Sequence, residues 1–290
     1  MVYNKGNTGG NDFMRNQTTI GEYLIHRLEE LGVADVFGVP GDYVLGFYDL
    51  LVESRMNVIG TCTEAGAGFA TDAYARVNGL GVLCITYCVG GLNALNSVAG
   101  AYAEKSPVIV ISGAPGLNER AKSPLLHHKV RDFNTQRLIF EKVTVAAVAI
   151  EDASTAPRDI DDMLEACLRH KRPVYIELPR DMVEASCALP KPWKTRWVES
   201  DPDALDEAIA ETSAMVRNAK RPVILAGSRF TDSGCRTYFA SSSKVRECRS
   251  RRRCWARASS ARYTRSTWVS TRAQRDGRMS AGSSRRRTAC

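Results

Sequence analysis

The chain lacks several features that would place it in a membrane or outside the cell. Its 290 residues contain no apolar run of about 18 residues, so we expect no transmembrane helix and no membrane partner. The first 17 residues have no apolar h-region, so we expect no signal peptide and interpret residues 1–17 as a disordered leader. The nine cysteines show no paired metal-binding spacing. We interpret Cys62, Cys84 and Cys88 as buried thiols in a reducing, cytoplasmic compartment.

Leucine and isoleucine are missing from residues 231–290. This segment has 15 Arg and one Lys against three acidic residues, so it carries +13 while the whole chain carries +8 and the remainder −5. It also holds 12 Ser. Without large apolar side chains it cannot bury a core, so we expect a disordered basic tail.

The tail has two interpretations. Its Arg, Ser, Cys and Trp enrichment begins abruptly after a strand-like segment, which favours a gene end read out of frame. Alternatively, Arg251–Arg253 and Arg285–Arg287 form a basic arm that contacts nucleic-acid phosphates. We favour the first interpretation and do not expect a nucleic-acid partner.

The rest of the chain alternates between strand and helix patterns. We predict helices at residues 19–32, 43–54, 64–78, 90–105, 153–170 and 202–218, and strands at residues 33–39, 57–63, 81–89, 107–113, 142–150, 173–179 and 221–227. Strands that alternate with helices every 20 to 30 residues predict an α/β fold, a doubly wound parallel sheet with helices on both faces.

Composition also divides the chain. We predict an α/β domain over residues 18–182, a proline-rich linker over 183–201, and the start of a second α/β domain over 202–230. A domain usually needs roughly 100 residues, so we interpret the second one as incomplete. The Arg- and Ser-rich tail over 231–290 follows it.

Two acidic residues follow predicted strands. Pro40-Gly41-Asp42 suits a tight turn, and Glu64 stands where a helix begins. In a doubly wound sheet, ligands bind beyond the carboxyl ends of the strands, so both acids should share one rim. The alternatives are a simple turn at Asp42 and a helix-dipole partner at Glu64. The helix after Glu64 is rich in alanine and glycine, so we expect something to approach its backbone closely.

Four segments carry a resemblance to a known family. They are FGVPGDY at residues 37–43, TEAGAGFATDAYAR at 63–76, YCVGGLNALN at 87–96 and LLHH at 125–128. Together, over about residues 18–228, they resemble the N-terminal pyrimidine-binding domain of thiamine-diphosphate-dependent 2-oxo-acid decarboxylases, of the pyruvate, indolepyruvate or phenylpyruvate type. Acetolactate synthases share much of this pattern and remain an alternative. GVPGDY with the adjacent histidines favours the decarboxylases.

The resemblance implies a cofactor and its contacts. In this family the acid matching Glu64 hydrogen-bonds the aminopyrimidine of thiamine diphosphate, which helps the ring's 4′-nitrogen take the thiazolium proton. Val89 and Gly90 match residues that pack on the pyrimidine, and backbone near Gly41 matches the lining of the same slot. The cofactor then serves as the electron sink for loss of carbon dioxide, which leaves an aldehyde.

Asp42, His127 and His128 match the polar cluster of the family. The resemblance assigns them to the substrate carboxylate and to proton transfer, a task that suits histidine because it titrates near neutral pH. Without the resemblance, two adjacent loop histidines are more often solvated surface residues. The substrate implied is a small 2-oxo acid.

The family places Mg²⁺ and the diphosphate on a later Gly-Asp-Gly segment, and this sequence contains none. The family also forms homo-oligomers, dimers or tetramers, with each site shared between subunits. We therefore expect this chain to carry the pyrimidine half of a site and to be inactive or weakly cofactor-binding alone. The alternative is a non-catalytic fragment, with or without nucleic-acid binding by the tail.

Overall fold

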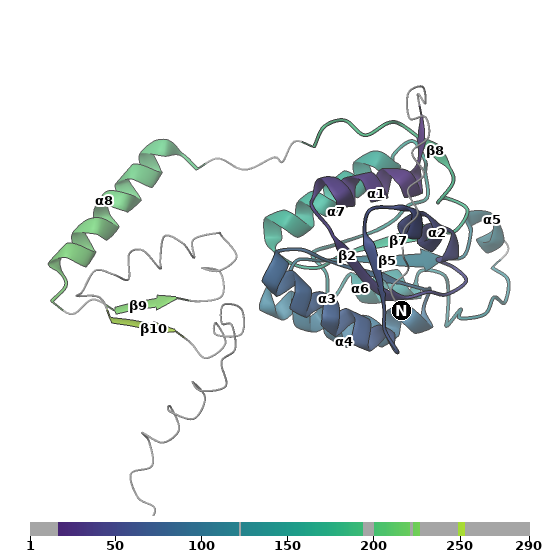
Figure 1. Cartoon of the computed structure of the whole chain (residues 1–290), viewed down its shortest axis with the longest axis horizontal. Helices are drawn as coiled ribbons and strands as arrows, with labels where there is room; N and C mark the ends of the chain where they lie inside the picture. Colours follow the sequence, from purple (N-terminus) through teal and green to yellow (C-terminus); the bar gives the residue numbers. More distant parts are fainter. Residues whose placement is uncertain (1–16, 122, 194–199, 221–222, 227–248, 253–290) are drawn as a thin grey trace, which may run out of the picture. The chain divides into compact units, whose positions relative to one another are not determined.

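The computed structural model describes residues 17–121, 123–193, 200–220, 223–226 and 249–252 (Figure 1). The chain divides into two compact units, residues 1–209 and 210–290. The first unit holds the sheet and all of the candidate site residues, so most of the description concerns it. Among the described residues, no helix is both long and apolar enough to cross a membrane.

The first unit is built on a six-stranded parallel sheet, as the alternating pattern predicted. Its strands are β2 (Asp35–Val39), β3 (Asn57–Gly60), β4 (Gly81–Ile85), β5 (Val108–Ala114), β6 (Ala146–Ala149) and β7 (Val174–Pro179), in the spatial order β3-β2-β4-β5-β7-β6. The chain moves outward from β2 to β3 and then returns past β2 to β4. The sheet therefore has a topological switch point between β2 and β4, where open α/β sheets bind their ligands.

Helices cover both faces of this sheet. One core contains α1 (Ile20–Glu30), α2 (Leu45–Glu53) and α7 (Ala156–His170), and the other contains α3 (Glu64–Asn78), α4 (Val89–Glu104) and α6 (Thr135–Phe140) (Figure 1). Strand β4 shows why there are two cores, because Val82 packs into the first and Leu83 into the second. Neighbouring strand residues point to opposite faces, so a strand buried on both sides is apolar throughout.

Helices α3 and α4 pack closely because α3 carries glycine where α4 approaches. A methyl group added at Gly68 would lie 1.9 Å from the Ser97 hydroxyl oxygen on α4. The expected close approach to α3 is therefore made, at least in part, by α4. Since Glu64 opens α3 and Val89 opens α4, this packing fixes the two helix starts relative to each other.

Several predicted boundaries are wrong by a few residues. Strand β3 ends at Gly60, and the Thr61 hydroxyl then donates to the Thr63 carbonyl at 2.8 Å in a turn. Cys62 lies in that turn and is exposed, which corrects the expectation of a buried thiol. Strand β4 ends at Ile85 instead of reaching Val89, which is already helical.

Other strands and helices begin later than predicted. Strand β6 begins at Ala146, because residues 142 and 143 form a turn after α6. Helices α2 and α7 also begin two or three residues late. The bounds of α3 and of α8 (Pro202–Asn218) are as predicted.

Residues 18 and 19, just before the first helix, pair with residues 186 and 187. Thr19 caps α1 and forms a capping box with Glu22. Just before it, β1 (Thr18–Thr19) pairs antiparallel with β8 (Ser186–Cys187), a pairing that we did not predict. This pairing places Ser186 and Cys187, which we assigned to the linker, beside the first helix.

The second unit contains a parallel pair of short strands. These are β9 (Val223–Ala226), at the predicted strand, and β10 (Arg249–Arg252). Strand β10 lies in the tail that we expected to lack structure, so these four residues are an exception to that expectation. Arg251 and Arg252 are strand residues, whereas Arg253 and Arg285–Arg287 lie outside the described residues.

Candidate active site

The predicted site residues lie in the segments that follow strands at the carboxyl edge of the sheet. Asp42 follows β2, Glu64 follows β3 after its turn, and Val89 follows β4. The two histidines come later, in the segment between α5 (Leu117–Arg120) and α6. Parallel strands bring all of these segments to one edge, as the topology predicts.

Glu64 is the first residue of α3 and is partly buried. The helix is capped by the Thr63 hydroxyl, which accepts a hydrogen bond from the Gly66 amide at 3.1 Å. One carboxylate oxygen of Glu64 accepts a hydrogen bond from the Asn93 amide on α4 at 2.7 Å. The positive ends of two helix dipoles therefore face this acid.

The other carboxylate oxygen of Glu64 faces Gly90 in the first turn of α4. A methyl group added at Gly90 would lie 3.2 Å from this oxygen and 2.9 Å from the Thr86 methyl. A methyl group added at Gly41 would lie 2.6 Å from Cβ of Thr86. Thr86 therefore joins the turn after β2 to the start of α4, and both glycines are needed for this packing.

Thr86 is a residue that the sequence analysis missed. Its side chain is buried, and its hydroxyl oxygen has no hydrogen-bond partner among the described residues. Buried polar atoms without partners are uncommon in native proteins and each requires an explanation. Its position at the carboxyl end of an apolar strand was a usable signal, because that edge carries the ligands in this fold.

Val89 begins α4 and leaves 51% of its surface exposed, although it follows a fully buried strand. The residue before it, Cys88, has φ 54° and ψ −80°, a conformation that non-glycine residues rarely adopt. Such backbone conformations cost on the order of 1–3 kcal/mol and gather at functional sites. The strained turn is therefore what brings the exposed Val89 and the start of α4 beside Glu64.

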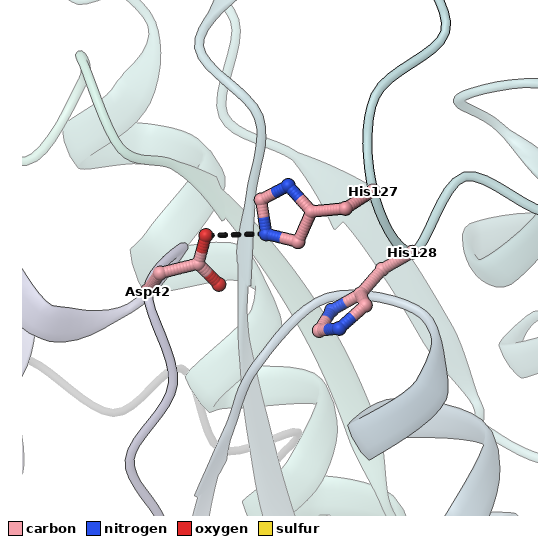
Figure 2. Close-up of side chains that lie close together, drawn as sticks. All are labelled: Asp42, His127 and His128. Atoms are coloured by element: carbon pink, nitrogen blue, oxygen red, sulfur yellow. Dashed lines mark ion pairs between the residues drawn. The ribbon is translucent and has the colours of Figure 1, made fainter.

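Asp42, His127 and His128 form a second cluster (Figure 2). An Asp42 carboxylate oxygen lies 2.5 Å from Nε2 of His127. The two imidazole rings lie 4.7 Å apart at 65°. These contacts make the adjacent histidines part of an organised group rather than independent surface residues.

Tyr43 positions this cluster through its contacts with His127. Its ring stacks on His127 at 4.7 Å, and its hydroxyl donates to the His127 carbonyl at 3.1 Å. The same hydroxyl lies 3.1 Å from Nδ1 of His127. Burial, with a smaller contribution from the Asp42 charge, raises the pKa of Tyr43, so the phenol keeps its proton. The Tyr43 contacts were also missed from the sequence.

A salt bridge lies beside the cluster. Arg180 pairs with Glu119, with one contact of 2.9 Å from Nε, and its guanidinium lies 5.5 Å from the Tyr43 ring. The hydrogen bond from Arg180 lowers the pKa of Glu119. The two charges neutralise each other, so the Asp42 carboxylate remains the local charge next to the histidines.

A buried polar network supports α4 from the interior. Gln136 donates to the Ser112 hydroxyl at 2.7 Å and to the Tyr175 hydroxyl at 2.6 Å, and it fills the space beside Gly91. Tyr175 in turn donates to Glu177 at 2.9 Å. Burial raises the pKa of Glu177, although a nearby arginine opposes the shift. The Oε1 atom of Gln136 is buried and has no hydrogen-bond partner among the described residues, so this network is only partly paired.

Two connected groups of residues thus make up the site. Glu64, Gly41 and Gly90 meet around Thr86, with Val89 exposed beside them. Asp42, next to Gly41 in the chain, begins the group that includes both histidines. The other two histidines lie elsewhere, His26 beside Glu30 on α1 and His170 at the end of α7.

Residues 18–136 match the family described as thiamine pyrophosphate enzyme, N-terminal TPP binding domain. The matched range contains every residue of both groups, and it includes the strands on either side of the switch point. This part of the chain is therefore similar to the N-terminal domain of thiamine pyrophosphate enzymes.

The chain is also similar to decarboxylases of 2-oxo acids. It is 40% identical over 215 residues to a pyruvate decarboxylase of Aspergillus parasiticus, covering 71% of this chain and 37% of the relative. It is 42% identical over 208 residues to an indole-3-pyruvate decarboxylase of Azospirillum brasilense, covering 71% and 38%. A probable pyruvate decarboxylase of Schizosaccharomyces pombe is 37% identical over 235 residues, covering 79% and 41%. The chain spans about two fifths of the length of these relatives.

Proposed function

We propose that this chain supplies the pyrimidine-binding side of the active site in a thiamine-diphosphate-dependent decarboxylase that converts a 2-oxo acid to an aldehyde. The observation that carries the proposal is the carboxylate of Glu64, held at the start of α3 against the glycine-lined start of α4. The similarity to pyruvate and indole-3-pyruvate decarboxylases supports the reaction class.

The residues around Glu64 fit the cofactor's aminopyrimidine. A flat ring needs an apolar surface, and the exposed Val89 at the start of α4 supplies one beside Glu64. The Thr86 hydroxyl, which has no hydrogen-bond partner within the described part of the chain, adds a polar group beside Gly41 and Gly90. When bound, thiamine diphosphate supplies the electron sink for loss of carbon dioxide.

Glu64 is proposed to accept a hydrogen bond from a protonated ring nitrogen of the pyrimidine. A carboxylate can hold such a proton strongly, because a hydrogen bond to a charged group is worth about 1.5–3 kcal/mol. Asn93 donates to one Glu64 oxygen and thereby orients the other oxygen for this contact. Glu64 is the catalytic residue of the proposal, because its carboxylate contacts the cofactor, whereas Asn93 is a positioning residue.

The second group is proposed to handle the substrate and its protons. A proton shared between His127 Nε2 and the Asp42 carboxylate can be delivered to a reacting carbon by a small movement of either side chain. His128, packed against His127, is proposed to contact the substrate carboxylate. Acetolactate-synthase-like chemistry is the alternative, and adjacent histidines with GVPGDY favour decarboxylation.

Other elements of the proposal lie outside the described domain. We expect the diphosphate to be held through Mg²⁺ by residues beyond the pyrimidine-binding domain, and the active assembly to be a homodimer or homotetramer. Decarboxylation by the chain alone is therefore expected to be weak or absent. These expectations rest on the resemblance stated above.

A chimera tests the proposed function. Residues 18–190 of this chain would replace the matched part of the Azospirillum brasilense indole-3-pyruvate decarboxylase, and aldehyde formation from pyruvate and indole-3-pyruvate would be measured with thiamine diphosphate and Mg²⁺. We expect activity, and we expect Glu64→Gln to lower kcat/KM by roughly 10²–10⁴. Glu53→Gln, at an exposed acid of α2, is the matched control. Full activity in Glu64→Gln would refute the proposal.

A further inference from the structure

Asp42, His127 and His128 present three metal-ligand atoms to one small volume. One carboxylate oxygen and one nitrogen of each ring all lie within 4.8 Å of one another. Figure 2 shows the Asp42 side chain facing His127, with His128 next to it. The aspartate and the histidines come from segments more than eighty residues apart, so the fold and not the local sequence assembles them.

The donor types match a particular class of ion. Imidazole suits first-row divalent metals such as Zn²⁺, and two histidines with one carboxylate leave a fourth, open position for water. Zinc bonds of about 2.0–2.2 Å place tetrahedral ligand atoms about 3.3–3.5 Å apart. The present separations therefore require movements on the order of 1 Å. The Asp42 and His127 side chains are 42% and 55% exposed.

Tyr43 orients His127 for metal binding. The tyrosine hydroxyl donates to the His127 carbonyl, so its oxygen can accept a hydrogen bond from Nδ1 of the same residue. With a proton on Nδ1, the lone pair of Nε2 points toward Asp42 and is available to an ion. A second hydrogen bond of this kind fixes the tautomer of metal-binding histidines in general.

His128 gives an independent indication of a missing partner. Its Nδ1 atom is buried and has no hydrogen bond within the described part of the chain. Its backbone φ is 65°, a left-handed value that costs energy for a residue with a side chain. The strained backbone at His128 thus places this ring beside His127. Among the described residues, no hydrogen bond to Nδ1 offsets the strain.

The neighbouring cations do not oppose an ion at this position. Arg180 is paired with Glu119. The Lys129 ammonium donates to Ser123 and to the Pro124 carbonyl at 2.9–3.0 Å. Glu119 balances the charge of Arg180, and the Asp42 carboxylate balances that of Lys129, so these groups together carry no excess positive charge that would repel a cation.

We propose that Asp42, His127 and His128 bind one divalent transition-metal ion of the Zn²⁺ type, with water at the open position. The inference rests on the geometry of these side chains and not on the proposed decarboxylase function. The ion replaces the proton between Asp42 and His127, so metal binding and proton transfer by this cluster exclude each other. Bound metal would thus inhibit any reaction that uses these side chains.

Calorimetric titration of Zn²⁺ into the purified chain tests this site. The 290-residue chain would carry no polyhistidine tag, and its thiols would be alkylated so that cysteine does not compete. We expect one ion per chain, released by a chelator. Asp42→Asn, His127→Gln and His128→Gln should each weaken binding by at least about tenfold, since even outer-shell partners of metal sites are worth 10–100-fold.

The other two histidines of the chain supply the controls. His26→Gln and His170→Gln should leave the Zn²⁺ affinity unchanged, and circular dichroism should show that every variant keeps its fold. The proposal is overturned if the unaltered chain binds no zinc, or if the cluster variants bind it as tightly as the controls. Because binding and not decarboxylation is measured, failure here would leave the proposed function standing.

Discussion

The two residue groups of the candidate site are held in opposite ways. The Glu64 group is enclosed by helix starts and glycines, with Thr86 95% buried between Gly41 and Gly90. The histidine group lies on exposed chain segments and is held by one ion pair, one tyrosine and ring contacts. The first group depends on packing, so its position is rigid, whereas the second depends on charge and hydrogen bonds and can adjust.

This difference in rigidity suits the different tasks proposed for the two groups. A group that orients a cofactor gains from rigidity, because small displacements cost large factors in rate. A group that moves protons must approach and leave its partners. The same difference predicts that substitutions near Glu64 will change stability, whereas substitutions in the histidine group will change chemistry with little effect on stability.

The largest effect is expected at Gly38, in the strand that supports the rigid group. A methyl group there would lie 1.9 Å from the Cys84 carbonyl oxygen and 2.2 Å from the Tyr48 hydroxyl. Gly38→Ala should therefore lower the free energy of unfolding by about 3 kcal/mol, near the upper end of the range for overpacking. Gly60→Ala is the control, because nothing lies within 4 Å of its added methyl group. Urea unfolding of both variants checks the difference, and equal stabilities would contradict this account.

A smaller effect, with a definite pH dependence, is expected at Glu177 in the network beneath α4. Burial raises its pKa above the ordinary value of 4.5. The folded chain thus binds this proton more tightly than the unfolded chain does. Its stabilising contribution is therefore complete below pH 4.5 and is lost as the pH rises through the folded-state pKa. Glu177→Gln should remove this loss, which amounts to at most about 1.4 kcal/mol per pH unit.

The stability contribution of Glu119, beside the histidine group, is expected to depend on pH with the opposite sign. Its pKa is lowered by Arg180, so its contribution is present above the ordinary value of 4.5 and is lost as the pH falls through the folded-state pKa. Denaturant unfolding of Glu177→Gln and Glu119→Gln across a pH series measures both slopes. If Glu177→Gln kept the slope of the unaltered chain above pH 4.5, the pKa of Glu177 would not be raised in the folded chain, contrary to this account.

The smallest effect on stability is expected in the histidine group. Asp42→Asn and His127→Gln each remove an exposed ion pair, and such pairs contribute about 0–1 kcal/mol. Both variants should unfold within about 1 kcal/mol of the unaltered chain while they lose zinc affinity. A loss above about 2 kcal/mol in urea unfolding would show that this group is part of the packed scaffold.

The sequence predicted most of the scaffold because local signals were strong. The capping box at Thr19 and the ends of α3 were visible in side chains that act within a few residues. The end of β4 was missed because Tyr87 and Cys88 continue an apolar run, while the backbone turns at Cys88. An apolar run along the chain does not indicate the residue at which a strand ends.

The site was harder to predict, because its contacts join distant segments. The resemblance named Asp42 and both histidines, but the stacking of Tyr43 on His127 spans 84 residues. The position of Thr86 at the end of an apolar strand was a signal in the sequence, but its packing between Gly41 and Gly90 is visible only in the fold. Glu177 is a single acid within an apolar strand of the sequence, and only the fold shows that its side chain is enclosed.

The central claim is that Glu64 activates the cofactor, and proton exchange at the thiazolium carbon of bound thiamine diphosphate measures this directly. Magnetic resonance would follow hydrogen–deuterium exchange at that carbon in the chimera, in its Glu64→Gln variant and in its Glu53→Gln control. We predict exchange at least about 10²-fold slower in Glu64→Gln and unchanged in the control. Equal exchange rates in all three proteins would contradict the role proposed for Glu64.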